Sequence, residues 1–302
     1  MRSKYLYIGE EEKRNMISIA YIIAGIGLLH ATITDMRTRE VPDWLSYSLI
    51  CMGLGIGVIS SIGASSFYPA LSSLAGLVLG VIIGFVMFYA GQWGGGDSKL
   101  IMGLGALIGL PVFQGISWLQ LPDFIIFLLN TIGVGALYGL SWAVIMIARH
   151  WKAFRKNLTE RLHHKDIIKF RVILIIIVVV LIVSALVVQS TPIQLLLAFI
   201  ALSLFFLFYI WHVSKAIEET CMIKTIPVSK LTEGDWIAEE VKHKGKVLAS
   251  PADLGITLEQ IAKLKQFKIA KVVIKEGIPF VPSFLVAYLL LLILGNWLRF
   301  LI

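Results

Sequence analysis

Two aspartates stand at the ends of hydrophobic segments, where they could act together as an acid and a base. Asp97 follows three consecutive glycines, and Asp35 follows the first hydrophobic segment of the chain. Glycine lets the backbone leave helical geometry and lets another segment approach closely. Irregular backbone at membrane depth is tolerated only where protein or a water-filled cavity surrounds it, and an ionisable residue in such a place is a candidate functional residue.

Paired carboxylates favour one kind of reaction. Two carboxyl groups held together in a partly desolvated pocket cannot both ionise easily, so the pair shares a proton. The ionised member can act as a general base toward a water molecule, while the protonated member polarises a scissile carbonyl group. This is the chemistry of aspartic proteolysis, which requires no metal, no cofactor and no serine or cysteine nucleophile.

The hydrophobic pattern places both aspartates on one side of a membrane. Segments 44–62 and 71–91 lie between Asp35 and Asp97, so the chain crosses twice and returns. The spacing does not show whether the two side chains touch. Because they end different helices and carry like charges, we expect them to be too far apart to share a water molecule until a substrate draws them together.

The composition indicates an all-α polytopic membrane protein. Of the 302 residues, 58% are hydrophobic and only 15% are charged, whereas a soluble domain has about 25% charged residues. A membrane span requires about 20 mostly apolar residues. Eight segments meet that requirement, approximately 16–34, 44–62, 71–91, 100–118, 124–148, 172–189, 192–212 and 280–301.

A polar, lysine-rich stretch before the last span predicts a small cytoplasmic α/β module. It is expected to contain a strand over 236–241, a hairpin turn at Lys244-Gly245, a helix opened by a Thr257/Gln260 capping box, and a strand over 270–274. The expected divisions of the whole chain are an N-terminal tail 1–15, a catalytic transmembrane core 16–148, a basic connector 149–171, two further transmembrane helices 172–212, the soluble module 213–279 and a C-terminal transmembrane helix 280–302.

The basic residues are distributed as in a protein of the cell membrane. Most of the 27 Lys and Arg residues lie in loops on the side of the two aspartates, which the positive-inside rule places in the cytoplasm. The net charge of +8 therefore does not indicate a nucleic-acid partner. We expect the basic connector 149–171 to lie on anionic lipid headgroups.

The residues around the aspartates have expected structural roles. Asp43 follows Pro42 and is predicted to cap a helix or to have another local structural role, rather than to be a third catalytic carboxylate. The small-xxx-small spacing of Gly76, Gly80 and Gly84 predicts close helix packing, and Asn130 is predicted to form an interhelical hydrogen bond. The two cysteines and six histidines form no metal-ligand pattern, so no metal site is expected.

The segment Gly94–Leu100 resembles the GxGDxKL signature of type IV prepilin peptidases, and Asp35 followed by Val41-Pro42-Asp43 resembles the first catalytic segment of that family. The C-terminal part, with Ile278-Pro279-Phe280-Val281-Pro282 before a final span, resembles the archaeal members, including preflagellin (archaellin) peptidases. The resemblance is strongest over residues 20–110. It implies a membrane aspartic endopeptidase in which Asp35 and Asp97 are catalytic.

The resemblance also implies a substrate. Prepilins and archaellins have a hydrophobic helix and a short basic leader, and the two aspartates could cut between them at the cytoplasmic edge of the membrane. Bacterial members usually carry a four-cysteine motif and an N-methyltransferase activity; this chain lacks those cysteines, so peptidase activity alone is expected. Glu40 and Asp43 could meet the basic leader. Gly94, Gly95, Gly96 and Lys99 are further candidates for shaping the site.

Two other classes of protein remain open at this point. Presenilin-like and signal-peptide-peptidase-like proteases share GxGD, but they have Tyr before the first aspartate, where this chain has Thr34. They also have Pro-Ala-Leu after GxGD, whereas Pro69-Ala70-Leu71 precedes it here. A proton-coupled transporter could also use paired carboxylates in a glycine-rich bundle, but would place them near the membrane midplane.

Overall fold

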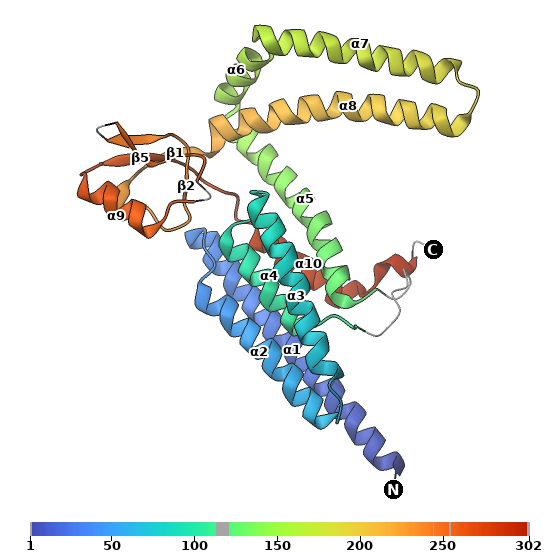
Figure 1. Cartoon of the computed structure of the whole chain (residues 1–302). Coiled ribbons are helices and arrows are strands. Elements are labelled where there is room, and N and C mark those ends of the chain that lie inside the picture. Colours follow the sequence, from blue (N-terminus) through green and yellow to red (C-terminus); the bar gives the residue numbers. More distant parts are fainter. Residues whose placement is uncertain (1, 113–120, 244, 254, 301–302) are drawn as a thin grey trace. The chain divides into compact units, whose positions relative to one another are not determined.

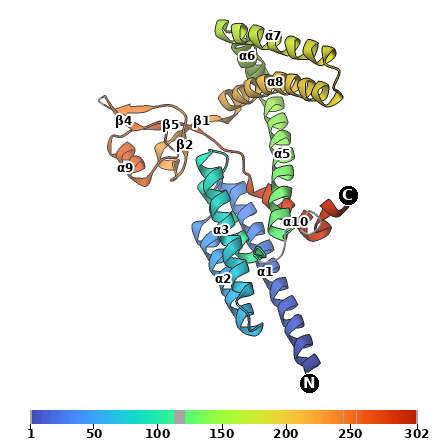
Figure 2. The same ribbon diagram turned by 45° about the vertical axis from the view of Figure 1, so that its right-hand side comes forward.

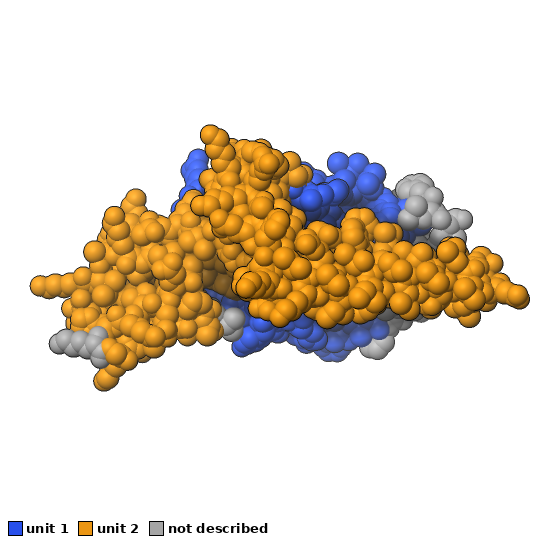
Figure 3. All heavy atoms as spheres, turned by 90° about the horizontal axis from the view of Figure 1, so that it is seen from above, with its two compact units in different colours: residues 1–140, 277–302 blue, residues 141–276 orange. Residues whose placement is uncertain are grey.

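The computed structural model describes residues 2–112, 121–243, 245–253 and 255–300. The described part is mostly helical, with a small group of strands (Figure 1). The chain forms two compact units, which are coloured separately in Figure 3. The first contains Met1–Leu140 and Gly277–Ile302, and the second contains Ser141–Glu276.

The first unit is a helical bundle. Its helices are α1 (Arg2–Thr38), α2 (Asp43–Gly63), α3 (Tyr68–Tyr89), α4 (Gly95–Ile108), the first part of α5 (Asp123–Arg149), and α10 (Val281–Leu294), followed by a 3-10 turn at Trp297–Phe300. The last helix therefore packs with the first ones, although more than 130 residues of the second unit separate them in the sequence. Helix α1 is helical from Arg2, so the segment expected to be a tail belongs to this helix from that residue onward.

The core of the first unit contains large apolar side chains from α1, α2, α4, α5 and α10. The most deeply buried include Leu28, Leu104, Phe127, Phe284 and Tyr288. Two polar contacts hold α5 against the C-terminal part of the unit. Asn130 Nδ2 donates to the Ala287 oxygen at 3.2 Å, and Trp297 Nε1 donates to Asn130 Oδ1 at 2.8 Å. The predicted interhelical role of Asn130 is confirmed.

Close glycine contacts fix α4 against α3, which lies beside it in Figure 1. A Cβ atom on Gly76 would collide with the carbonyl oxygen of Gly105, and one on Gly80 or Gly84 would lie 2.9 Å from a carbonyl oxygen of α4. These distances are too short for a real side chain, so the small-residue packing predicted from the sequence is confirmed. This packing also positions Asp97, because Asp97 lies in the first turn of α4.

The second unit combines a helical hairpin with a small α/β module. Its helices are the end of α5, α6 (Trp151–Leu162), α7 (Lys165–Val187) and α8 (Thr191–Ile217), which continues into a π-helical turn at Glu218–Met222. Helices α7 and α8 lie side by side in both views (Figures 1 and 2). The module has β1 (Ile223–Pro227), a 3-10 turn (Val228–Lys230), β2 (Trp236–Ile237), β3 (Val241–His243), β4 (Lys246–Ala249), α9 (Leu258–Gln266) and β5 (Lys271–Lys275).

The strands form an antiparallel three-stranded sheet in the order β1-β5-β2 and a separate β3-β4 hairpin. Thr225 pairs with Val273, and Trp236 pairs with Lys275. The prediction of one continuous strand over 236–241 is wrong, because β2 ends at Ile237 and a new strand starts at Val241. The expected hairpin is present between β3 and β4, although Lys244 itself lies outside the described residues.

The predicted capping box at the start of α9 is confirmed. The Gln260 N–H donates to Thr257 Oγ1 at 3.3 Å, and the Thr257 N–H donates to Gln260 Oε1 at 2.9 Å. This reciprocal pair satisfies two N–H groups that have no partner within the helix. Helix α9 then buries Ile261 and Leu264 in the core of the module.

Six described helices are long and apolar enough to cross a membrane. They are Ile19–Thr38, Asp43–Gly63, Tyr68–Tyr89, Asp123–Arg149, Lys165–Val187 and Thr191–Met222. The other two expected spans, 100–118 and 280–301, contain α4 and α10, which have 14 residues each. A helix of 14 residues is about 21 Å long, shorter than the hydrocarbon core of about 30 Å. Residues 113–118 and 301 of those spans lie outside the described residues.

Candidate active site

Asp35 lies in the last turn of α1, and its side chain is buried with 5% of its surface exposed. Its own main chain helps to end the helix. Arg39 adopts a left-handed φ of 62°, and its N–H donates to the Asp35 carbonyl oxygen at 2.9 Å. This is the αL form of helix C-cap, which is uncommon for a residue other than glycine or asparagine. The turn fixes the direction in which the chain leaves Asp35.

The Asp35 carboxylate lies at the N-terminus of α10. Its Oδ2 accepts a hydrogen bond of 3.0 Å from the N–H of Val281, the first residue of that helix. The main-chain N–H of Phe280 also interacts with this carboxylate. N–H groups in the first turn of a helix have no acceptor within the helix, and the helix dipole favours an anion there. The last helix of the chain thus stabilises a negative charge on Asp35.

Asp97 lies in the first turn of α4 and is partly exposed. Its Oδ2 accepts a hydrogen bond of 3.2 Å from the N–H of Gly94, the residue that precedes the helix. Ser98 Oγ donates to the carbonyl oxygen of Gly94 at 3.1 Å. These local bonds start α4 and hold the aspartate side chain at its N-terminal end.

One of the three glycines before Asp97 brings the two aspartate-bearing segments together. A Cβ atom on Gly96 would lie 3.0 Å from the Val41 Cβ and 3.2 Å from the Val41 nitrogen. Val41 is buried and follows the turn that ends α1. Cβ atoms on Gly94 and Gly95 would have only ordinary contacts, at 3.7 and 3.8 Å. Glycine at position 96 therefore lets α4 begin directly against the segment leaving Asp35 without a shift of either segment.

The two carboxyl groups influence each other electrostatically. Although part of the residue is exposed, desolvation of its carboxyl group, and then the charge of Asp35, raise the pKa of Asp97 to about 7, while the Gly94 N–H opposes that rise. An aspartate with such a pKa is protonated in a large fraction of molecules near neutral pH. The site therefore contains one carboxyl group, that of Asp35, which main-chain N–H groups hold, and a second, that of Asp97, which readily keeps its proton.

The expected role of Asp43 as a side-chain cap is wrong. The residue that caps α2 is Pro42, and Asp43 is the first helical residue, with no side-chain hydrogen bond to the helix start. Its carboxylate instead accepts from Lys99 Nζ, at 2.6 Å to Oδ1 and 2.7 Å to Oδ2. This ion pair joins the start of α2 to α4, two residues after Asp97. Because both side chains are well exposed, its contribution to stability is about 0–1 kcal/mol.

The structure brings together most of the residues singled out from the sequence. Gly94, Gly95 and Gly96 lead into Asp97, Lys99 pairs with Asp43, and Glu40 is exposed on the connection between α1 and α2. Among the described residues, no group of three or more His, Cys, Asp or Glu side chains is arranged to hold a metal ion.

Sequence reasoning missed the part of the site contributed by the C-terminal helix. The Phe280-Val281-Pro282 segment carried a usable signal, because proline in the first turn marks a helix N-terminus, where N–H groups are free to bind an anion. It also missed Tyr138 of α5, whose phenol lies close enough to Asp35 and Arg39 to be influenced by their charges. A single tyrosine in an apolar helix gives no sequence signal for such a position.

Comparisons with known proteins agree with this geometry. Residues 22–140, which contain both aspartates, match the type IV leader peptidase family. Over this segment the chain is similar to members of that family. Its relatives include preflagellin peptidases of Methanococcus voltae, Methanococcus maripaludis and Methanocaldococcus jannaschii.

The chain is 31% identical to the first of these relatives over 160 residues, 40% identical to the second over 96 and 40% identical to the third over 114. The matches cover 52%, 32% and 35% of this chain, and 66%, 40% and 48% of the relatives. The chain thus spans less than two thirds of the length of each. The resemblance of its C-terminal segment to archaeal members of the family agrees with these matches.

Proposed function

We propose that this protein is a membrane-embedded aspartic endopeptidase that removes the short basic leader from type IV prepilin-like or preflagellin precursors. The observation that carries the proposal is the unequal environment of its two aspartates. Asp35 is held by N–H groups of α10, whereas burial and the charge of Asp35 keep Asp97 partly protonated. One group is suited to act as a base and the other as an acid.

In the proposed reaction, Asp35 takes a proton from a water molecule as the water oxygen attacks the scissile carbonyl carbon. Asp97 gives its proton to the carbonyl oxygen, which forms a neutral tetrahedral diol. The diol collapses when the amide nitrogen takes the proton from Asp35 and the C–N bond breaks. A hydroxyl proton returns to Asp97, so both groups regain their starting states.

We further propose that both aspartates face the cytoplasm of a cell-membrane protein with eight crossings. Two long apolar helices, α2 and α3, lie between Asp35 and Asp97, so both residues are on one side whatever the total number of crossings. In this proposal the other two crossings are the segments that contain the shorter helices α4 and α10, and the α/β module is inserted before α10. The basic loops on that side support the cytoplasmic orientation.

The precursor and the bilayer are the proposed partners. The precursor is a pilin or archaellin with a basic leader and an apolar helix. Glu40, whose side chain is exposed just after α1, could bind the basic leader. The basic segment 149–171, which contains α6, is proposed to lie on anionic headgroups. Peptidase activity without N-methylation is expected, because the chain has only two cysteines.

The test is co-expression with candidate prepilins and preflagellins, read as the gel shift that follows removal of the leader. Processing by the wild-type protein, together with its loss in the Asp35→Asn and Asp97→Asn variants, would support the proposal. A wild-type protein that is inserted in the membrane but processes neither class of precursor would overturn it. The family match favours this function over a presenilin-like protease or a transporter.

A further inference from the structure

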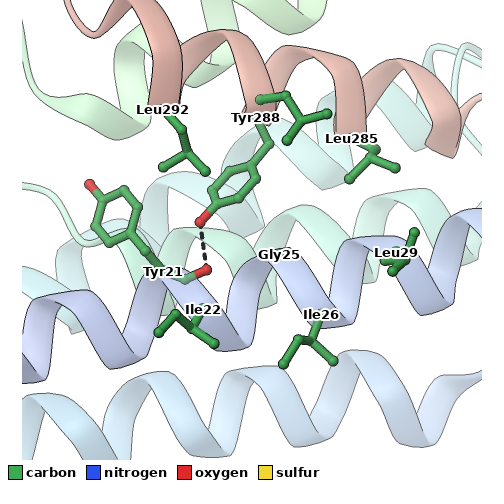
Figure 4. A pocket seen from close by; sticks show the side chains of 9 residues that line it. Tyr21, Ile22, Gly25, Ile26, Leu29, Leu285, Tyr288 and Leu292 are labelled. Carbon is green, nitrogen blue, oxygen red and sulfur yellow. Dashed lines mark hydrogen bonds between the residues drawn. The ribbon is translucent and has the colours of Figure 1, made fainter.

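An apolar groove with a volume of about 740 Å³ runs along the first unit between α1 and α10 (Figure 4). Side chains from both helices line it. The lining residues are Tyr21, Ile22, Gly25, Ile26, Leu29, Leu285, Tyr288, Leu289 and Leu292. The aliphatic walls are open to the surroundings, with Ile22 60%, Ile26 64% and Leu29 52% exposed.

The polar atoms beside the groove already have partners within the protein. The Tyr288 hydroxyl donates to the Tyr21 carbonyl oxygen at 2.6 Å, as the dashed line in Figure 4 shows, and the Tyr21 hydroxyl donates to Asp123 Oδ2 at 2.5 Å. Gly25 forms a low point in the α1 wall, where a side chain would meet the ring of Tyr288 at 3.4 Å. The groove therefore offers an apolar surface, and at Gly25 an apolar side chain of a ligand can approach the α1 backbone.

Both walls lead to the same aspartate. Along α1, the exposed apolar residues continue from Ile26 and Leu29 through Ile33 to the turn that contains Asp35. Along α10, Val281 binds the Asp35 carboxylate and lies one helical turn before Leu285, which lines the groove. The distance from Tyr21 to Asp35 along α1 is about 21 Å, which matches about 14 residues of a helix lying beside it.

We propose that this groove binds the apolar helix of the precursor and holds the bond that precedes the helix at Asp35. This inference rests on the proposed function and adds a binding surface to it. The occupant must be long and apolar, because the groove is both, and it must present its N-terminal end at Asp35, because the leader lies on the cytoplasmic side. A precursor helix that runs parallel to α10 meets both requirements. A lipid chain fits the walls but has no bond that requires alignment with Asp35.

Photocrosslinking tests the occupant directly. A photoreactive phenylalanine analogue replaces Ile26 in full-length protein that also carries Asp97→Asn, so the precursor stays uncut in the membrane. The same analogue at Ile59 of α2, which is 60% exposed, is the matched control. We expect adducts with the precursor helix at position 26 and few at position 59. Equal yields at both positions, or adducts with lipid alone at position 26, would overturn the proposal.

A second pair of variants tests the groove through kinetics. Gly25→Leu fills the low point of the groove, whereas Gly55→Leu adds the same side chain to α2, where a Cβ meets nothing within 4 Å. We expect Gly25→Leu to raise KM for the full precursor about tenfold or more and to leave cleavage of a short peptide without the apolar helix unchanged. Wild-type KM for the full precursor in Gly25→Leu would overturn the groove assignment alone. Failure of the wild-type protein to cleave any precursor would instead overturn the proposed function.

Discussion

The Asp35 carboxylate accepts a hydrogen bond from the main-chain N–H of Val281, with 3.0 Å between Oδ2 and nitrogen. This bond joins the end of the first helix to the start of the last one. The orphan N–H groups at the start of a helix can stabilise a negative charge on this carboxyl group. In a two-aspartate mechanism, the residue so held is suited to act as the base, and its partner Asp97 as the acid.

The first prediction is that Asp35→Asn and Asp97→Asn each abolish precursor processing. An amide cannot take a proton from water, and it cannot exchange a proton with the substrate as a carboxyl group does. Processing is measured as leader removal by purified protein in detergent, with membrane insertion checked in parallel. Asp43→Asn is the control and should keep substantial activity, because it removes only an exposed ion pair with Lys99. Measurable cleavage by either active-site variant would contradict the assignment.

Several features could be predicted because their causes are local in the sequence. The four-residue spacing of Gly76, Gly80 and Gly84 is sufficient to predict a helix face without side chains, and that face contacts α4. The Thr257/Gln260 capping box depends on two residues three positions apart.

Other features depend on tertiary contacts that spacing does not encode. The residues next to Asp43 predict a helix cap, but its carboxylate instead pairs with Lys99, which lies 56 positions later in the chain. Val281 is 246 positions from Asp35, so no local pattern joins them. Helix α4 ends at Ile108, where Gly109 adopts a φ of 77°, although the apolar composition continues.

The second prediction concerns pH. Burial and the charge of Asp35 raise the pKa of Asp97 to about 7, so the protonated form decreases as the pH rises through that value. If Asp97 is the acid, kcat should be high below about pH 7 and fall by about tenfold for each unit well above it. The same sign applies to stability: folding favours the protonated group, so its contribution is present at low pH and lost as the pH rises through the folded pKa.

The measurement is the pH dependence of kcat for a purified precursor at saturating concentration. Asp43→Asn should give the same profile as the wild-type protein, because the exposed Asp43 belongs to the ion pair with Lys99. A rate that stays constant well above pH 7, or one that rises there, would show that protonated Asp97 is not required.

The third prediction concerns the glycine next to Asp97. Gly96→Ala would place a Cβ atom 3.0 Å from the Val41 Cβ, so either α4 or the segment after Asp35 must move. Because a displacement of about 1 Å between catalytic groups can lower kcat about a hundredfold, the smaller shift required here should lower kcat several-fold. Gly95→Ala is the matched control, since its Cβ would make an ordinary contact of 3.8 Å with Phe88. Equal kcat values for the two variants would contradict the role given to Gly96.

The fourth prediction concerns stability. Gly76→Ala would place a Cβ atom against the carbonyl oxygen of Gly105, so α3 and α4 must separate. Overpacking of this kind typically costs about 1–3 kcal/mol. Gly133→Ala in α5 is the control, because a Cβ there meets nothing within 4 Å and alanine is the better helix former. Thermal unfolding in detergent should occur at a lower temperature for Gly76→Ala only, and a wild-type transition for that variant would contradict the packing argument.

The last prediction is that the two aspartates approach each other only when a precursor is bound. Without substrate, each carboxylate accepts a bond from a different main-chain N–H: Asp35 from Val281 and Asp97 from Gly94. Bringing them close enough to share one water molecule requires repulsion between like charges or protonation of one. The binding energy of a substrate helix can supply that cost, as in other enzymes in which closure assembles the site.

Crosslinking measures this approach. Asp35→Cys and Asp97→Cys are combined in protein whose exposed Cys51 is replaced by serine, since the second native cysteine, Cys221, is buried. A short bifunctional thiol reagent should join the pair slowly in the free protein and faster when a precursor is added, which the double variant cannot cut. An Asp43→Cys/Lys99→Cys pair is the control: these two side chains are already in contact, so its crosslinking should not depend on the precursor. Equally efficient crosslinking of the 35/97 pair with and without precursor would show that the site is preformed.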